Sequence, residues 1–322
     1  MNILVTGGLG AIGSWITREV IAQGHLPVIF DQGSDRSLIS DLEVEVVSGS
    51  ITSLTEVIEV IRAHKIDRVI HAAALMPPEC ALHPERAIAV NVGGAQTVFD
   101  AARLSGIQRI VTFSSKAVYG EIPEPYNFPD YRPLPESLRL APNSIYGATK
   151  AMVEQLAAQA ISSWGQSIIC LRLGTTFGPG KSRHGILSIH SGIIDAAIDG
   201  RPLEIDQGSE ESTDLIFNGD VGRAAVLAAM AESPKHKIYN VGTGQPTRLG
   251  DFVQWVKDLL PQANVKVGPG LNFMKQAEPS YCVLDVDRAK TDFGFGSCKI
   301  GAEGVAAYIQ AAHQLKLSGG AE

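Results

Sequence analysis

Two residues near the middle of the chain, Tyr146 and Lys150, have the types and the spacing of an acid–base pair. They stand four positions apart at the start of a helix expected from about Ser144 to Trp164, so both side chains project from one helical face. A tyrosine near its ordinary pKa of about 10 is a poor base at neutral pH, but an adjacent ammonium group stabilises the phenolate. The pair is therefore predicted to move a proton, although an isolated pair of this kind is usually structural.

A serine upstream of this pair supplies a third group. Ser115 follows a strand expected at Arg109–Phe113, and ligands bind at the carboxyl ends of strands in open α/β sheets. We expect Ser115 to hold the substrate oxygen that Tyr146 protonates or deprotonates. Tyr119 is a rival phenol, but no lysine follows it at helical spacing.

The amino-terminal loop TGGLGAIG (6–13) is typical of a dinucleotide site, and its expected binding residues are Gly7, Gly10, Ala11, Ile12 and Gly13. Glycines there permit a tight turn, close approach of a pyrophosphate and close packing of the next helix, whose N terminus offers free N–H groups. Asp31 follows at about the expected distance of ~20 residues. Its carboxylate would accept hydrogen bonds from ribose hydroxyls and repel a ribose phosphate. The loop therefore predicts NAD rather than NADP, although Arg36 could reach a phosphate.

Strands and helices alternate through the first half of the chain, which predicts an α/β fold with a doubly wound parallel sheet of the Rossmann type. The expected strands are Asn2–Thr6, Leu26–Phe30, Val44–Val47, Arg68–His71, Arg109–Phe113 and Ser167–Leu171, and the expected helices are Ala11–Gln23, Leu54–Ala63, Ala87–Leu104 and Ser144–Trp164. The proline-rich segment Glu121–Asn143 is expected to be a loop. These elements bring the glycine loop, Ser115 and Tyr146 to one edge of the sheet.

After residue 177 the alternation loosens. Short strands are expected at Leu203–Ile205 and Lys237–Val241, among helices such as Val221–Ala231 and Leu249–Leu259. We expect residues 1–177 to form the NAD-binding domain that carries the catalytic residues. Residues 178–322 are expected to form a smaller C-terminal α/β region that mainly binds the substrate and could cross back to the sheet.

Composition narrows the class of protein. The 322 residues carry a net charge of −7 with no basic run, which argues against a nucleic-acid surface. No apolar stretch is long enough to span a bilayer and no signal sequence precedes the first strand, so we expect a cytoplasmic protein without membrane contact. The four cysteines and eight histidines show no metal-binding spacing, so we expect no metal site and unpaired thiols.

Together these segments resemble the extended short-chain dehydrogenase/reductase family, of the NAD-dependent epimerase/dehydratase type. The resemblance covers nearly the whole chain and includes VIHAAAL (69–75), SSKAVYG (114–120), YGATK (146–150), LRLGTTFGPG (171–180) and YNVGTG (239–244). It implies a catalytic triad of Ser115, Tyr146 and Lys150, with Lys150 bonded to the nicotinamide ribose and lowering the tyrosine pKa. It also implies cofactor contacts from Ser50, Ile51, Ala72, Ala73, Ala74 and Asn91.

The chain departs from this family where nucleotide sugars bind. Ser50 replaces an acid that meets the adenine, and Thr175 replaces an asparagine. Thr213 stands in place of an arginine, and Lys275 begins the segment that resembles Arg-Pro-Gly-Asp. Each lost arginine removes a bidentate phosphate contact, so a UDP-type diphosphate is expected to be held poorly.

We therefore predict a dehydrogenase that oxidises or reduces a secondary alcohol or ketone of a small polar substrate, such as a sugar, sugar acid or hydroxy amino acid. The candidate substrate residues are Ser115, Lys116, Thr175, Arg183 and Lys275, and Arg172, Lys181 or His184 could also bind a carboxylate. The alternatives are an NAD-dependent nucleotide-sugar epimerase and a non-enzymatic NAD-binding sensor or structural relative. A homodimer is expected through the helices near 87–104 and 144–164.

Overall fold

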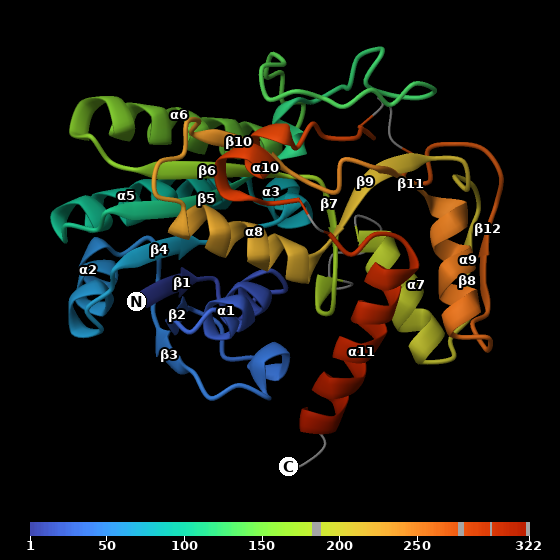
Figure 1. Ribbon diagram of the computed structural model, residues 1–322, viewed down its shortest axis with the longest axis horizontal. Coiled ribbons are helices and arrows are strands. Elements are labelled where there is room, and N and C mark those ends of the chain that lie inside the picture. Colours follow the sequence, from blue (N-terminus) through green and yellow to red (C-terminus); the bar gives the residue numbers. More distant parts are fainter. Residues whose placement is uncertain (182–187, 276–279, 297, 320–322) are drawn as a thin grey trace.

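The protein is described by a computed structural model over residues 1–181, 188–275, 280–296 and 298–319 (Figure 1). At its centre lies a seven-stranded parallel sheet in the order β3-β2-β1-β4-β5-β6-β10. Its strands are β1 (Asn2–Thr6), β2 (Leu26–Asp31), β3 (Glu45–Ser48), β4 (Arg68–His71), β5 (Arg109–Ser115), β6 (Ile168–Leu173) and β10 (Ile238–Val241). The doubly wound Rossmann sheet predicted from the sequence is confirmed.

Helices cover both faces of this sheet, as the alternating sequence pattern requires. One face packs against α2 (Leu54–Ala63), α5 (Gly94–Leu104) and α6 (Ile145–Trp164) through Val57, Val98 and Val153. The other packs against α1 (Gly13–Ala22), α8 (Asn218–Met230) and α10 (Asp287–Phe293) through Ile16, Ala224 and Ala289. The strands other than the edge strand β3 are largely buried on both faces, which explains why they read as nearly continuous apolar runs.

The helix expected at Ala87–Leu104 is present, but its first part is wound more widely than an α-helix. The short helices α3 (Pro77–Leu82) and α4 (Pro84–Ala87) lead into a wide π-type turn, η2 (Ile88–Gly93), before α5 begins at Gly94. A side chain at Gly94 would meet Ile51, because a Cβ built there lies 2.5 Å from the Ile51 Cδ1 atom. Asn91 lies within this wide turn, where its amide bonds Leu75 and Thr149.

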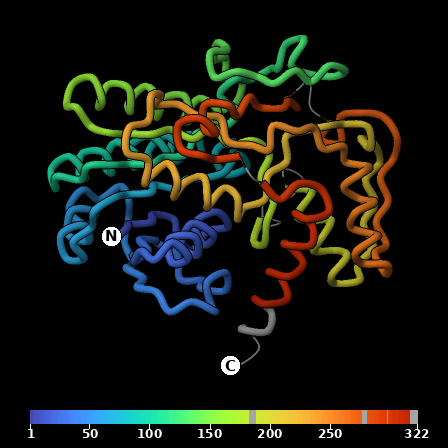
Figure 2. Tube along the Cα trace, viewed as in Figure 1, coloured from blue at the N-terminus to red at the C-terminus, as the bar shows by residue number. Residues whose placement is uncertain are grey.

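The second half of the chain lies beside one end of the sheet, to the right in Figures 1 and 2. It contains α7 (Ile189–Ile198), α9 (Leu249–Leu259), α11 (Ala302–Gly319), a β12 (Val265–Val267) and β8 (Leu203–Ile205) pair, and a sheet of β11 (Pro246–Arg248), β9 (Ser212–Phe217) and β7 (Thr175–Phe177). A separate apolar cluster around Phe177, Phe217 and Phe252 holds these elements together. Because β10 pairs with β6, the chain beyond residue 178 also returns to the central sheet. The division at 177/178 stays a prediction.

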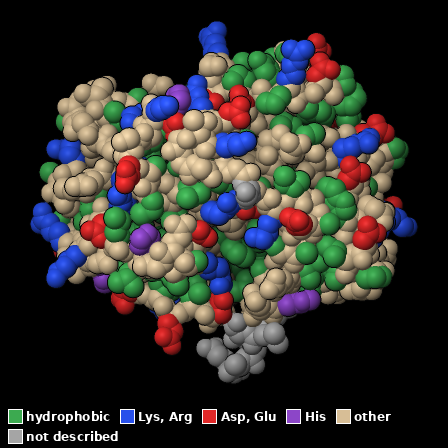
Figure 3. Space-filling view, viewed as in Figure 1, with side chains coloured by type: hydrophobic (Ala, Val, Ile, Leu, Met, Phe, Trp, Pro, Cys, Tyr) green, Lys and Arg blue, Asp and Glu red, His purple; other side chains and the backbone are tan. Residues whose placement is uncertain are grey.

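On the face drawn in Figure 3, Lys and Arg side chains are interspersed with Asp and Glu side chains. No helix within the described ranges combines the length and apolarity that a membrane span needs. The four cysteines are unpaired, and all but Cys298 are buried.

Candidate active site

A cavity of about 650 Å³ opens where the carboxyl ends of the central strands meet the second half of the chain. Its lining includes Ile12 beside the glycine loop, Ser115 at the end of β5, and Tyr146 and Lys150 on α6. Parallel strands bring their carboxyl ends to one edge, which is why residues far apart in sequence meet there. We call it the catalytic cavity.

The glycine loop has the geometry of a phosphate-binding turn. Gly7 has φ +71°, and a Cβ there would lie 2.7 Å from the Ala73 backbone. A Cβ on Gly13 would lie 2.0 Å from the carbonyl oxygen of Gly7, so α1 packs on the turn only with glycine at this position. No described side chain caps the N terminus of α1 at Ile12. The N–H groups of Ser14 and Trp15 bond the carbonyls of Gly10 and Ile12, whereas the Gly13 N–H makes no such bond within the described residues and can meet an anion. The loop and α1 therefore fit the pyrophosphate of NAD.

Asp31 lies at the end of β2 beside this loop. Its carboxylate accepts hydrogen bonds from the backbone N–H of Leu9 at 3.1 Å and of Gly33 at 2.9 Å. These bonds fix the acid where a ribose of the cofactor would lie. The hydroxyl of Ser50 pairs with Thr52 at 2.8 Å, whereas Ile51 is buried against the core.

The β4 edge of the cofactor site is built by backbone contacts. Ala72 and Ala74 line the catalytic cavity, and Ala73 packs against Gly7. Asn91 is 2% exposed, accepts a hydrogen bond from the Leu75 N–H at 2.7 Å and donates one to the Thr149 hydroxyl at 3.2 Å. It therefore ties the segment after β4 to α6, one residue before Lys150.

The proposed catalytic groups converge at the start of α6. Ser144 caps the helix, because its side chain accepts a hydrogen bond from the Gly147 N–H at 3.1 Å. The Lys150 ammonium lies 5.6 Å from the centre of the Tyr146 ring and donates to the Phe113 carbonyl at 2.9 Å. Ser115 hydrogen-bonds Tyr146. The structure therefore brings together the three residues that the sequence predicted as a triad.

Burial sets the charge states of this group. It raises the pKa of Tyr146 to about 12, although the hydrogen bond from Ser115 acts in the opposite direction. Burial also lowers the pKa of Lys150 to about 8. Both shifts follow from the cost of holding charge away from water. The cationic nicotinamide ring of NAD, if bound beside Tyr146, would stabilise the phenolate. It would therefore lower the pKa of Tyr146 and oppose the effect of burial.

Lys116 and residues from the second half of the chain complete the catalytic cavity. The Lys116 ammonium donates to the Ser280 carbonyl at 2.8 Å and lies 3.5 Å from the Thr213 hydroxyl. Thr213 and Thr175 share a hydrogen bond of 2.7 Å, so the two threonines that replace family polar residues satisfy each other. Lys181 and His190 also line the catalytic cavity, and both residues are buried.

Arg172 does not face a substrate, which corrects the expectation that it could bind a carboxylate. Its guanidinium forms two hydrogen bonds of 2.7 Å with Glu154, and the two side chains are 3% and 1% exposed. It also donates to the Tyr119 hydroxyl at 2.9 Å. Burial raises the pKa of Tyr119 to about 12, so this phenol is held neutral as part of the core.

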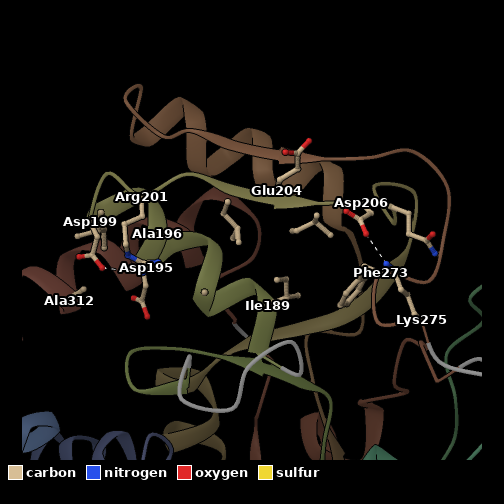
Figure 4. Close-up of a pocket in the computed structure, with 15 residues that line it drawn as sticks. Ile189, Asp195, Ala196, Asp199, Arg201, Glu204, Asp206, Phe273, Lys275 and Ala312 are labelled. Atoms are coloured by element: carbon tan, nitrogen blue, oxygen red, sulfur yellow. Dashed lines mark hydrogen bonds and ion pairs between the residues drawn. The ribbon is translucent and has the colours of Figure 1, made fainter.

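Lys275 lies at a different cavity, of about 840 Å³, between α7 and β8 (Figure 4). Its ammonium forms an ion pair of 2.7 Å with Asp206, and both side chains are exposed. Figure 4 shows Asp195, Asp199 and Arg201 at one side of this lateral cavity and Asp206, Lys275 and Phe273 at the other. The structure therefore does not bring Lys275 to the catalytic cavity. Arg183 and His184 lie outside the described residues.

Sequence reasoning missed several residues of the catalytic cavity. His190 on α7, Ser280 and Tyr281 line this cavity. None of them belongs to a recognised motif, and none stands at a helical or strand spacing from Tyr146. α7 is held by α9 and α11, and the segment before α10 is held by hydrogen bonds from Lys116 to Ser280 and from Asp214 on β9 to Cys282. No cluster of three or more His, Cys, Asp or Glu side chains suited to a metal occurs in the described part of the chain.

Comparisons with known proteins agree with this geometry. The model of the NAD dependent epimerase/dehydratase family matches residues 3–242. The UDP-glucose 4-epimerase of Corynebacterium glutamicum is 26% identical over 312 residues, which cover 92% of this chain and 90% of that protein.

Solved structures superpose over almost the full length. A UDP-glucose 4-epimerase from Stenotrophomonas maltophila, with bound NAD and formylated UDP-arabinopyranose, has a TM-score of 0.85 and 25% identity, covering 99% of each chain. MoeE5 in complex with UDP-glucuronic acid and NAD has a TM-score of 0.79 and 26% identity, covering 98% of this chain and 99% of that one.

Proposed function

Because the chain belongs to the NAD-dependent epimerase/dehydratase family, we propose that it is a sugar epimerase that oxidises a secondary alcohol and reduces the ketone again within one turnover. The similarity to UDP-glucose 4-epimerases supports this alternative better than the simple dehydrogenase first predicted. The observation that carries the proposal is the convergence of Ser115, Tyr146 and Lys150 on one cavity beside the glycine loop.

The residues of the chain act on the proton. NAD held at the glycine loop would supply the hydride acceptor for the alcohol carbon and the hydride donor for the ketone. Tyr146, as the phenolate, removes the hydroxyl proton, and the same tyrosine gives the proton back when the ketone is reduced. Ser115 orients the oxygen, and the Lys150 ammonium stabilises the phenolate. Rotation of the ketone between the two half-reactions would expose its opposite face and invert the carbon.

Asp31 and the glycine loop are proposed to select the cofactor. The Asp31 carboxylate lies at the end of β2, where it would meet a ribose hydroxyl and repel a ribose phosphate. The turn itself requires glycine at both positions, because a side chain at Gly7 would collide with the Ala73 backbone and one at Gly13 with the Gly7 carbonyl.

A dehydrogenase of a small polar substrate remains the second candidate. It is favoured by the neutral Thr175–Thr213 pair, which occupies positions where the family holds polar and guanidinium contacts to a nucleotide diphosphate. Such an enzyme would release NADH after each turnover, whereas an epimerase reoxidises it in place.

The NAD content of the purified protein separates the two candidates. The protein is denatured and the released nucleotide is quantified per chain, in parallel with UDP-glucose titrations that follow Tm. Close to one NAD per chain, together with a rise in Tm on adding UDP-glucose, is expected for the epimerase. Little bound NAD, with NADH accumulating at 340 nm on a free sugar, would instead select the dehydrogenase. Bound NADP would overturn the role given to Asp31.

A homodimer through α5 and α6 is also proposed. The two helices lie side by side on one face of the sheet (Figure 1), and Leu104, Met152 and Trp164 are exposed on them. Exposed apolar groups on adjacent helices are suited to a self-complementary interface. Light scattering during size-exclusion chromatography tests this: a mass near 34.2 kDa, that of one chain, would contradict it.

A further inference from the structure

The catalytic cavity has an unusual charge inventory for an acidic protein. Its described lining includes three lysines, Lys116, Lys150 and Lys181, and no aspartate or glutamate. The chain as a whole carries 34 acidic and 27 basic residues. Lys150 belongs to the proposed catalytic group, which leaves two ammonium groups in the cavity without an assigned partner.

Lys181 is the more buried of these two. Lys181 is 7% exposed, and its ammonium group has no hydrogen bond or ion pair among the described residues. Burial lowers its pKa to about 8, so it is still largely protonated at neutral pH. A buried cation without a partner is costly, and a site that retains one commonly uses it for an anionic ligand.

Lys116 is held in place by neutral groups. It donates to the Ser280 carbonyl and to Thr213, and its ammonium lies 5.7 Å from the centre of the Tyr281 ring. These contacts occupy two of its three N–H donors and leave the charge uncompensated. Its neighbour His190 is buried, and the proximity of Lys116 contributes to the low pKa of that imidazole, about 3. His190 is therefore neutral and supplies no competing charge.

We propose that the substrate carries a carboxylate, which the ammonium groups of Lys116 and Lys181 bind within the catalytic cavity. This assignment deepens the proposed function and rests on it. Ser115 and Tyr146 would then act on a hydroxyl of a sugar acid rather than of a neutral sugar.

Donor count favours a carboxylate over a diphosphate. A carboxylate has two oxygens, which suit single N–H donors from two lysines. A diphosphate carries more charge and more oxygens, and proteins commonly hold it with bidentate arginine. The described lining of the catalytic cavity contains no arginine, and Arg172 nearby is fully engaged by Glu154.

The test is a two-by-two set of probes. D-glucose, D-glucuronate, UDP-glucose and UDP-glucuronate separate the effect of the carboxylate from that of the diphosphate. Dissociation constants are measured by calorimetry on the full chain with saturating NAD. D-glucuronate is expected to bind about 10- to 100-fold more tightly than D-glucose, and UDP-glucuronate than UDP-glucose, because each acid adds charged hydrogen bonds.

Variants assign this preference to residues. Lys116→Met and Lys181→Met keep the length of the side chain and remove the charge, and each is expected to reduce the acid preference about tenfold. Lys116→Arg is expected to retain most of it. Lys266→Met is the matched control, because Lys266 is exposed on β12 and lines neither cavity.

Three outcomes would overturn the proposal. One is equal binding of acid and neutral probes, and a second is a preference that follows the diphosphate alone. The third is a Lys181→Met variant in which the affinity for NAD falls by the same factor as the affinity for the acid probes. That result would assign Lys181 to the cofactor site. Failure of the proposed function looks different: glucuronate would still bind in a lysine-dependent way, but no probe would be epimerised or oxidised.

Discussion

The catalytic and lateral cavities of this protein differ in whether their basic side chains have acidic partners. The lateral cavity is lined by four acidic and two basic residues, and both bases are paired, Lys275 with Asp206 and Arg201 with Asp199. These side chains are exposed, so their charges cost little. In the catalytic cavity the lysines are more buried and lack acidic partners in the described lining. The larger cavity is therefore not the one whose chemistry points to a reaction.

Arg172 sharpens this contrast, because it is a buried cation that does have a partner. It lies beside the catalytic cavity and forms a two-point ion pair with Glu154. A buried pair of this kind is structural, since neither charge can be offered to a ligand without leaving the other alone. Burial alone thus does not indicate function; burial without a counter-charge does.

The largest expected effect is on turnover. Tyr146→Phe removes the hydroxyl that transfers the proton, so kcat is expected to fall about 10³-fold, within the range of lost general acid–base catalysis. The NAD content should stay nearly unchanged. Steady-state kinetics and nucleotide quantification check both. Retained turnover would show that the reaction does not occur at the catalytic cavity as assigned.

Breaking the paired cation is expected to cost stability. Arg172→Met leaves Glu154 buried without its counter-charge, and the free energy of unfolding should fall by about 3–5 kcal/mol. Urea denaturation measures the change. A loss under about 1 kcal/mol would mean that the pair contributes no more than an exposed one.

Removing the unpaired cation is expected to do the reverse. The pKa of Lys181 is lowered from 10.5 to about 8, which corresponds to a cost of about 3 kcal/mol. Lys181→Met should therefore raise Tm by several degrees at pH 7 without ligand. Below pH 8 the lysine is protonated in both the folded and unfolded states, and the cost is fully present. As pH rises from 8 to 10.5 the folded protein loses the proton first, and the gain should disappear.

Thermal unfolding of Lys181→Met and of the Lys266→Met control, from pH 6.5 to pH 10, follows this change. A stabilisation that does not depend on pH would attribute the gain to packing rather than to the removal of charge.

The smallest effect is expected at the lateral cavity. Lys275→Met removes an exposed ion pair with Asp206, so the free energy of unfolding should change by under about 0.5 kcal/mol. KM should stay within about twofold, since Lys275 does not line the catalytic cavity. A tenfold rise in KM would show that the substrate extends into the lateral cavity, and would restore the first expectation for this residue.

Local patterns predicted the frame of the site. The glycine loop, the alternation of strands and helices, and the four-residue spacing of Tyr146 and Lys150 depend on neighbours in sequence. Ser144, where their helix was expected to begin, caps it. The helix expected at Ala87–Leu104 is also present, but its π-type winding over Ile88–Gly93 was not predicted. The contact of Gly94 with Ile51, which excludes a side chain at Gly94, comes from a distant segment.

The sequence by itself thus determined the class of fold, the cofactor type and the candidate catalytic pair, because short-range periodicity and spacing encode them. Only the tertiary structure decided which cations are free to bind a ligand. Lys116, Lys181 and His190 come from separate segments, and Arg172 looked equally available until Glu154 was found against it. Whether a charge is paired depends on long-range packing, and that packing leaves no local pattern in the sequence.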